Sequence, residues 1–299
     1  MIEYRGFTKR YGDRTVVDRL TLTVPRGAVV ALLGPNGSGK TTSIKAAAGL
    51  TRPDSGEVLL GDARLPARDP RARGTCSFLP QRVSFPDALS GREVVEFYRR
   101  LRGAPAGAAD RVLKFASLNG AGARPVSTYS GGMVQRLGLA VATLGLADVL
   151  LLDEPTAALD PDGLCAFYGL VEERRRTGAA TFFSSHQLGD IERLADRVAV
   201  IVGGRLVAEF TEREIAARLS DRGVMRVRLA NRMPGLLDRV REQSPKALWF
   251  GDEMIIPGPA AARPAMLDLI RGAGAEITGL TAQEGRLDEF YRDLIGGAS

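Results

Sequence analysis

The segment GPNGSGKT, residues 34–41, decides the fold of this chain. It fits the pattern G-x-x-x-x-G-K-[ST], in which a glycine-rich loop turns its backbone N–H groups toward phosphate oxygens. The apolar run AVVALLG (28–34) precedes the loop and predicts a buried strand, and residues 40–50 predict a helix. This strand–loop–helix order is the context that the pattern requires, so we expect a phosphate site at the helix N-terminus.

The loop residues have separate predicted tasks. Lys40 is expected to place its ammonium group on the β- and γ-phosphates of a nucleotide, and Thr41 to ligate Mg²⁺ through its hydroxyl. Glycines at three positions let the backbone amides turn inward without a Cβ clash. The alternative is a glycine-rich turn that fits the pattern by chance. The predicted nucleotide-binding residues of the loop are Gly34, Pro35, Asn36, Gly37, Ser38, Gly39, Lys40, Thr41 and Thr42.

A second segment, VLLLDEP (149–155), carries two adjacent carboxylates. Its apolar residues predict a buried strand, so Asp153 emerges at the carboxyl end, where open α/β sheets bind ligands. Asp153 is expected to hold Mg²⁺ through the water shell of the metal. Glu154 is expected to polarise the water that attacks the γ-phosphate. By itself the segment also fits an ordinary acidic turn after a strand; together with the phosphate loop it indicates a hydrolytic site.

The single histidine of the chain, His186, follows the apolar run ATFFSS (180–185). From the residue alone, packing, metal ligation and chemistry are all open, and a structural role is the commonest. Metal ligation is disfavoured because no cysteine or second histidine stands at a ligand spacing. Parallel strands present their carboxyl ends at one edge of a sheet, so we expect His186 at the same edge as Asp153 and Glu154.

The composition excludes several classes of protein. Hydrophobic content of 44% with 25% charged residues is typical of a globular chain. No apolar run reaches the ~18 residues of a membrane-spanning helix, and the N-terminal residues carry no secretory signal pattern. Cys76 and Cys165 are too few for a disulfide framework, which favours a reducing cytosol. The net charge of +6 permits contact with nucleic acid or anionic lipid, but it is spread over the chain and indicates a solvated surface.

The order of predicted elements indicates an α/β domain with a largely parallel sheet over residues 1–219. A mostly helical block at about 87–146 interrupts the alternation and is expected to pack beside the sheet. The strands are predicted at 15–24, 28–34, 75–80, 149–153, 180–185 and 197–202.

Residues 220–299 have a different texture and predict a small α+β accessory domain. The predicted order is β-α-β-β-α-β, the ferredoxin-like arrangement, with the first strand at VMRVRLA (224–230). A closing helix follows, because Leu287, Phe290, Tyr291 and Leu294 share one helical face. This region shows no catalytic constellation, and a regulatory or dimer-bracing role is a hypothesis.

Between the glycine-rich segment (34–41) and the acidic segment (149–155) lies YSGGMVQR, Tyr129 to Arg136. Ser130 is a good helix N-cap, and the two glycines after it expose amides at the positive end of a helix dipole, which together make an anion site. At these residues the chain resembles the ATP-binding subunits of ABC transporters, from residue 1 to about 219. Ser130-Gly131-Gly132 resembles the signature motif of that family, with Tyr129 in place of the usual leucine and Met133 in place of the usual glutamine.

The resemblance implies a P-loop, RecA-like ATPase core with a helical subdomain, working as a head-to-tail homodimer with ATP and Mg²⁺. It implies that Tyr11 stacks on adenine, that Gln81 touches Mg²⁺ and the attacking water, and that His186 contacts the γ-phosphate. The implied catalytic residues are Glu154, His186 and Gln81, and the implied Mg²⁺ ligands are Thr41, Gln81 and Asp153. The residues implied to complete the site from the other subunit are Ser130, Gly131, Gly132 and Asp160.

The same resemblance implies a cytoplasmic protein on the inner face of the membrane, bound to separate permease subunits. Nucleic acid is not an expected partner. Family members that handle chromosomes carry a long coiled coil, those that act in translation carry two cassettes, and those that act in excision repair carry zinc modules. The sequence shows none of these features. A soluble nucleic-acid- or ribosome-acting ATPase is therefore a distant alternative, and a non-catalytic binding module is disfavoured by Glu154 and His186.

Within the family the chain resembles the ATPases of ABC-2-type exporters, which often end like GRLDEFYRDLI (285–295). Residues 84–103 and 135–145 look similar to the ATPase that serves copper-centre maturation of nitrous oxide reductase. That resemblance implies a periplasmic accessory partner and no copper on this chain. The alternative is the ATPase of a drug, lipid or other exporter.

Overall fold

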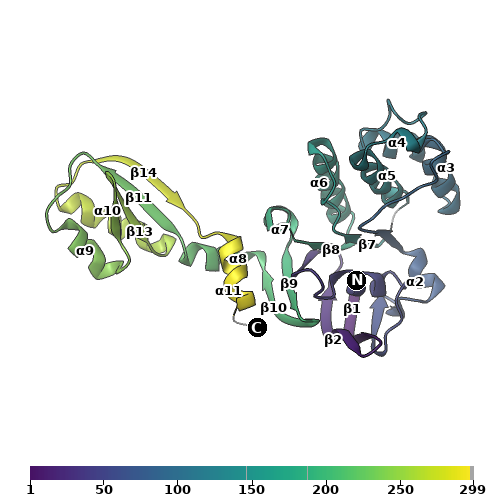
Figure 1. Ribbon diagram of the computed structural model, residues 1–299, viewed down its shortest axis with the longest axis horizontal. Helices are drawn as coiled ribbons and strands as arrows, with labels where there is room; N and C mark the ends of the chain where they lie inside the picture. Colours follow the sequence, from purple (N-terminus) through teal and green to yellow (C-terminus); the bar gives the residue numbers. More distant parts are fainter. Residues whose placement is uncertain (146, 187, 297–299) are drawn as a thin grey trace. The chain divides into compact units, whose positions relative to one another are not determined.

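The computed structural model describes residues 1–145, 147–186 and 188–296, and it divides into two compact units, Met1–Phe210 and Thr211–Ser299 (Figure 1). The sequence placed the division at 219/220, and the residues between the two positions form most of helix α8 (Glu212–Asp221). In the structure this helix belongs to the second unit.

A six-stranded sheet forms the centre of the first unit, in the order β10-β9-β3-β8-β7-β6. The pairs β9–β3, β3–β8, β8–β7 and β7–β6 are parallel, as the alternation of elements predicted. Every residue of β3, β7 and β8 is buried, which explains why these strands are almost continuous apolar runs. The strands are β3 (Val29–Leu33), β6 (Cys76–Leu79), β7 (Val149–Asp153), β8 (Ala180–Ser185), β9 (Arg197–Val202) and β10 (Arg205–Thr211).

Layers cover both faces of this sheet. Phe182 packs with the cluster that includes Ile44 of α1 (Lys40–Ala47), whereas Phe183 meets Phe167 of α6 (Pro161–Arg176) edge to face. Consecutive strand residues point to opposite faces, so α1 and α6 lie on opposite sides of β8. The short helix α7 (Leu188–Leu194) is the next element along the chain after β8.

A second, antiparallel sheet lies on the α1 side, in the order β2-β1-β4-β5. Its apolar residues join the same core as α1; the buried Tyr4, for example, donates its hydroxyl to the Ser43 carbonyl at 2.7 Å. Of these strands, only β2 was predicted from the sequence. The elements of this region are β1 (Ile2–Tyr11), β2 (Arg14–Val24), β4 (Ser55–Leu60), β5 (Leu65–Pro66) and the short helix α2 (Pro70–Gly74).

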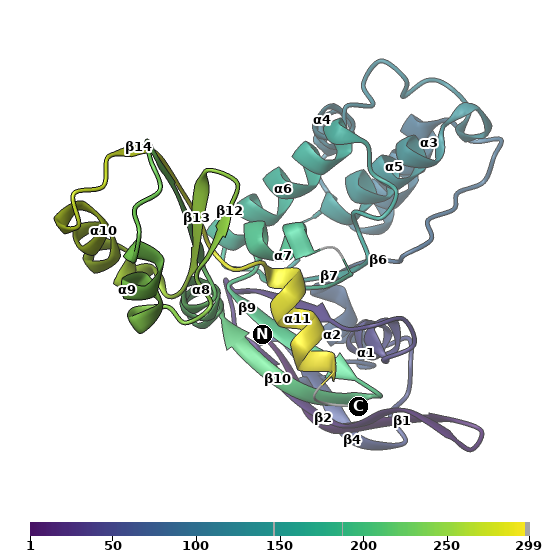
Figure 2. The ribbon, with the colours of Figure 1, turned by 60° about the vertical axis from the view of Figure 1, so that its left-hand side comes forward.

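The helical block has an apolar core of its own, as Figures 1 and 2 show by the grouping of α3, α4 and α5. Helix α3 begins with a capping box in which Ser90 and Glu93 exchange hydrogen bonds. At the other end of the block, Arg102 and Arg174 donate to carbonyl groups at the C-terminus of α5, which suits the negative end of the helix dipole. The elements are α3 (Gly91–Leu101), α4 (Ala108–Phe115), the 3₁₀ turn η1 (Val126–Thr128) and α5 (Gly131–Thr143).

The second unit contains the order of elements that the sequence predicted, β-α-β-β-α-β, in an antiparallel sheet ordered β12-β13-β11-β14. Met225, Val227 and Leu229 are buried beneath α9 and α10, and Arg226 and Arg228 point to the open face. Helix α11 packs against α8 through Phe290, which lies beneath the guanidinium groups of Arg218 and Arg222. The elements are α8, β11 (Val224–Leu229), α9 (Leu236–Gln243), β12 (Leu248–Phe250), β13 (Glu253–Pro257), the 3₁₀ turn η2 (Ala260–Ala262), α10 (Arg263–Gly272), β14 (Ile277–Gln283) and α11 (Leu287–Gly296).

Among the helices that the structure describes, none combines the length and the apolar character needed to cross a membrane. The described part of the chain also contains no cluster of three or more His, Cys, Asp or Glu side chains suited to hold a metal ion.

Candidate functional site

The glycine-rich loop joins β3 to α1, as predicted, and close contacts leave no room for a side chain at two of its glycines. A Cβ atom on Gly34 would lie 2.3 Å from the Ile201 carbonyl oxygen. Gly39 has φ +104°, and a Cβ there would lie 2.7 Å from the Val16 carbonyl oxygen. Side chains are therefore excluded at both ends of the loop, which allows a ligand to approach the backbone closely there.

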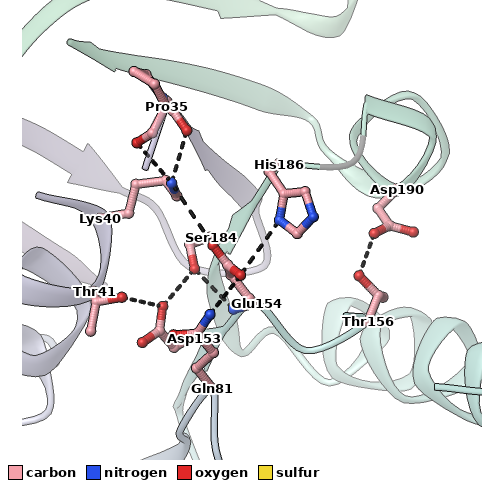
Figure 3. A network of polar contacts seen from close by, with 11 residues as sticks. Pro35, Lys40, Thr41, Gln81, Asp153, Glu154, Thr156, Ser184, His186 and Asp190 are labelled. Atoms are coloured by element: carbon pink, nitrogen blue, oxygen red, sulfur yellow. Dashed lines mark hydrogen bonds and ion pairs between the residues drawn. The ribbon is translucent and has the colours of Figure 1, made fainter. Parts of the chain in front are cut away.

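Lys40 begins α1 and is almost fully buried. Its ammonium group donates to the carbonyl oxygens of Gly34 at 2.8 Å and Pro35 at 3.2 Å, and its Nζ lies 3.9 Å from a carboxylate oxygen of Glu154 (Figure 3). Burial lowers the pKa of Lys40, while the carboxylates of Glu154 and Asp153 act in the opposite direction. The lysine thus carries a desolvated cation directly at the phosphate loop.

The carboxyl ends of β3, β8 and β7 meet at one edge because the strands are parallel neighbours. Asp153 at the end of β7 pairs in register with Ser184 on β8. Its Oδ1 accepts hydrogen bonds from Ser184 Oγ at 2.8 Å and Thr41 Oγ1 at 3.1 Å, whereas the buried Oδ2 has no partner among the described residues. Burial raises the pKa of Asp153, and the bonds from Ser184 and Thr41 oppose that rise.

Glu154 is the centre of the polar network. Its backbone has φ +48°, in the left-handed region that a non-glycine residue adopts only under constraint, and its amide donates to Ser184 Oγ at 2.9 Å. One carboxylate oxygen accepts from the Gln81 side-chain amide at 2.8 Å and lies 3.4 Å from His186 Nδ1 (Figure 3). The strained backbone turns this carboxylate toward Lys40, Gln81 and His186 together.

These side chains face a cavity of about 410 Å³. It is lined by Val16, Asn36, Gly37, Gly39, Lys40, Thr41, Thr42, Gln81, Glu154 and His186. Nine of these ten residues were predicted from the sequence. Of the other predicted loop residues, Gly34 and Pro35 hold Lys40 from behind, and Ser38 is buried. The structure thus gathers the phosphate loop, both carboxylates, Gln81 and His186 in one place.

A second network holds the segments that follow Glu154 and His186. Asp190 on α7 is buried and accepts hydrogen bonds from Thr156 Oγ1 at 2.6 Å and from the Tyr168 hydroxyl at 2.9 Å. Thr156 lies just after Glu154, and Tyr168 belongs to α6. Asp190 therefore ties the loop after Glu154 to the helix after His186, as Figure 3 shows for Thr156.

The Ser-Gly-Gly segment lies at a different place in the same chain. Ser130 caps α5 and accepts a hydrogen bond from the Met133 amide at 3.2 Å, as its residue type predicted. A Cβ on Gly132 would be 3.3 Å from the Ala158 carbonyl and 3.9 Å from the Asp160 carboxyl carbon. Asp160 in turn caps α6 and lies 3.4 Å from Arg136. These residues are not among those that line the cavity.

Tyr11 ends β1 with 53% of its surface exposed, and it also lies outside the lining of the cavity. The ammonium group of Lys9 is 5.2 Å from the centre of its ring. The stacking role that the resemblance implies for Tyr11 stays a prediction.

Two residues of the site were missed by the sequence analysis. Ser184 holds both Asp153 and the Glu154 amide, and Val16 on β2 is the apolar residue that lines the cavity. The signal for Ser184 was its place at the polar end of an apolar run, one strand away from Asp153. Val16 looked like an ordinary strand residue, since its exposure to the cavity depends on how β2 approaches the loop.

The arrangement suits the handling of a phosphate chain. Loop amides and Lys40 offer positive charge, and Thr41 with Asp153 offers hard oxygen atoms for a divalent cation. Glu154 presents a carboxylate on the cavity wall beside groups that can orient a water molecule.

Comparisons with known proteins agree with this chemistry. The ABC transporter family model matches residues 17–157. The chain is 32% identical over 301 residues to the daunorubicin resistance ATP-binding protein DrrA3 of Streptomyces coeruleorubidus, an alignment that covers 97% of this chain and 94% of that protein. It is 38% identical over 212 residues to the Nod factor export ATP-binding protein I of Burkholderia lata, with 70% of each chain covered. A solved dimeric bacterial ABC transporter cassette matches with a TM-score of 0.65 at 25% identity, over 71% of this chain and 99% of that one.

Proposed function

The chain belongs to the ABC transporter family, as an ATP-binding subunit of the drug and Nod-factor exporter type, and on that premise we propose that its cavity hydrolyses ATP to drive a separate membrane permease. The observation that carries the proposal is that Lys40, Thr41 and Glu154 line one cavity with the phosphate loop, and that Asp153 is hydrogen-bonded to Thr41. ATP is the substrate and Mg²⁺ the cofactor of such a site.

The donor set fits Mg²⁺. Asp153 keeps one buried carboxylate oxygen without a hydrogen-bond partner in the described structure, and its other oxygen shares a bond with Thr41. Oxygen ligands of this kind, few in number and leaving room for water and phosphate, are those that Mg²⁺ prefers. Thr41 and Asp153 would hold the cation, with Gln81 on the cavity wall. When bound, Mg²⁺ neutralises charge on the phosphate oxygens.

The protein groups then share the work of hydrolysis. Lys40 and the loop amides hold the β- and γ-phosphates in position, which is most of what phosphoryl transfer requires. Glu154 accepts the proton of the attacking water, and Gln81, already bonded to that carboxylate, orients the water. His186, with half of its side chain exposed at the cavity, donates to a γ-phosphate oxygen and senses its loss.

The second half of the site comes from another copy in this proposal. Gly131 and Gly132 expose amides at the N-terminus of α5, an anion site that lies away from the cavity lining of its own chain. A head-to-tail dimer would bring Ser130, Gly131, Gly132 and Asp160 of one subunit to the nucleotide of the other. Support comes from the similarity to a cassette solved as a dimer.

We place the chain at the cytoplasmic face of the membrane, where ATP is available and a permease can be reached through the helical block. In this proposal the permease selects the transported molecule. The relatives named above serve drug resistance and Nod-factor export. They favour the exporter alternative over copper-centre maturation, which, with its periplasmic accessory partner, stays a prediction from residues 84–103 and 135–145. Normal copper loading of nitrous oxide reductase after deletion of the gene would contradict that prediction.

The test replaces the proposed base. Glu154→Gln keeps the size of the side chain and removes the proton acceptor, so hydrolysis by the purified protein should fall by about 100-fold or more. ATP binding should persist, and dimers should accumulate with ATP. Glu173→Gln, at an exposed position of α6, is the matched control and should hydrolyse ATP at the parent rate. Parent-like hydrolysis by the Glu154→Gln chain would remove Glu154 from the mechanism.

A further inference from the structure

Tyr129, the residue directly before Ser130, is anchored in the helical block. Its ring is half-buried and packs against the apolar core formed by α3, α4 and α5. Its hydroxyl donates a hydrogen bond to the Ala121 carbonyl at 2.8 Å. The position of the ring is therefore fixed at both its apolar edge and its polar tip, one peptide unit away from Ser130.

The ring lies against Gly91, the first residue of α3. A Cβ on Gly91 would lie 2.2 Å from the Tyr129 hydroxyl oxygen and 3.1 Å from the ring carbon that bears it. Gly91 is buried, and it is not among the glycines with positive φ. Space for the tyrosine, and not backbone conformation, is thus what this position requires of its residue.

Backbone hydrogen bonds join the same two segments. The Arg92 amide donates to the Gly122 carbonyl at 2.8 Å, and the Gly91 amide to the Arg124 carbonyl at 3.3 Å. The Val126 amide donates to the Leu89 carbonyl at 2.8 Å. The chain that leads from Ala121 to Ser130 is therefore hydrogen-bonded to the start of α3, and Tyr129 makes the last contact before the Ser-Gly-Gly segment.

We propose that Tyr129 is a positioning residue, which locks the Ser-Gly-Gly segment to the start of α3 through its close fit against Gly91. The inference rests on the proposed function, because it concerns the segment that would meet the nucleotide of a second copy. A displacement of the ring moves Ser130 directly and leaves the cavity that binds ATP in its own chain unchanged, since neither Tyr129 nor Gly91 lines it.

The contact between Tyr129 and Gly91 would also pass a displacement of α3 on to the Ser-Gly-Gly segment. Helix α3 exposes Phe97 and Leu101, at 60% and 70% of their surface, on the outside of the helical block. A partner that shifts α3 along or about its axis would shift Gly91 against the tyrosine ring. Because packed side chains tolerate little displacement, the movement would be passed on to Ser130 instead of being absorbed.

The test is a double-mutant cycle in the full-length Glu154→Gln chain. ATP-dependent dimerisation is measured by analytical ultracentrifugation, and ATP binding to the monomer is measured with a fluorescent ATP analogue. Gly91→Ala should weaken dimerisation about tenfold or more, because the methyl group displaces the ring, and should leave nucleotide affinity unchanged. Tyr129→Phe removes the atom closest to the new methyl group, so Gly91→Ala combined with Tyr129→Phe should recover most of the loss.

Gly107→Ala is the matched control, since this glycine lies in the same helical block with no atom within 4 Å of an added Cβ. It should dimerise like the parent. Thermal unfolding identifies any variant that does not fold. If Gly91→Ala alone does not fold, the same change is made in a Tyr129→Leu chain, where it should have no effect. Parent-like dimerisation of Gly91→Ala, or a loss that Tyr129→Phe does not relieve, would overturn the lock. Failure of the parent Glu154→Gln chain to dimerise with ATP would refute the proposed dimer, and this inference with it.

Discussion

The two compact units of the chain treat polar side chains in opposite ways. In the first unit, charged and hydroxyl groups are buried close together at the edge of the parallel sheet, where Lys40, Asp153, Glu154 and Ser184 are all below 9% exposed. In the described part of the second unit, Ser244 is the one polar residue buried to that degree. Its core is built from aliphatic and methionine side chains between one sheet face and two helices.

The difference teaches where the chain accepts a cost in stability. Burying a charge is unfavourable unless partners compensate for lost water, and here they compensate only in part. Asp153 keeps an oxygen without a hydrogen bond in the described structure, and Glu154 keeps a left-handed backbone. Such costs concentrate where chemistry needs them. The described part of the second unit has no buried carboxylate and no non-glycine residue with positive φ, so we expect the hydrolytic role in the first unit.

The largest effect expected from this contrast follows the removal of the buried charge at Asp153. Asp153→Asn should lower Mg²⁺-dependent hydrolysis by about 100-fold or more, because a neutral amide is a poor ligand for a hard cation. The same change should raise the melting temperature at neutral pH. Burial raises the folded-state pKa of Asp153, so its ionised form destabilises the folded chain, and this destabilisation disappears as the pH falls through that pKa.

The measurement is a pair of melting curves, for the parent and Asp153→Asn chains, at several pH values without nucleotide. The stability advantage of the variant should shrink as the pH is lowered. An Asp153→Asn chain that is less stable than the parent at neutral pH would break the contrast between the two units.

A smaller effect is expected from a change in the second core. Val227 is fully buried on β11, and Val227→Ala should destabilise this unit by about 2 kcal/mol through lost contacts and a cavity. Trp249 is the single tryptophan of the chain and lies in the same unit, so its fluorescence follows that unit alone. ATP affinity should not change. Arg271→Ala, at an exposed position of α10, is the control. A large loss of ATP affinity in Val227→Ala would show that the units do not separate in function.

The smallest effect concerns Tyr11, at the exposed end of β1. If its ring stacks on adenine, Tyr11→Ala should raise KM for ATP about tenfold with little change in kcat, since base stacking is worth ~1–3 kcal/mol and stabilises ground and transition states alike. Tyr11→Phe should keep the parent KM. An unchanged KM in Tyr11→Ala would remove the tyrosine from the nucleotide site.

The features that could be predicted from the sequence are those marked by a short contiguous motif. The phosphate loop, the apolar strands of the parallel sheet and the carboxylates at the end of β7 were recognisable because each motif specifies its own strand–loop–helix context. Strand β11 was recognisable too, since Met225, Val227 and Leu229 alternate with arginines.

The missed features depend on contacts between distant segments. Strand β1 was not predicted, because bulges at Tyr4–Phe7 and Phe7–Lys9 break the alternation that marks a strand. The fit of Tyr129 against Gly91 links residues 38 positions apart, so neither residue type signals it alone. Ser184 shows its role only once β8 lies beside β7.

The central claim is that a nucleotide held by one copy is completed by the Ser-Gly-Gly segment of another, and subunit mixing tests it most directly. Lys40→Ala disables the phosphate loop and Ser130→Arg blocks the segment, so each variant alone should be inactive. In a head-to-tail dimer of the two, both defects fall in one site and the other site is intact. An equal mixture should therefore regain about one quarter of the parent hydrolysis rate, because half of the dimers are mixed and each has one working site. A mixture as inactive as its components would contradict the account.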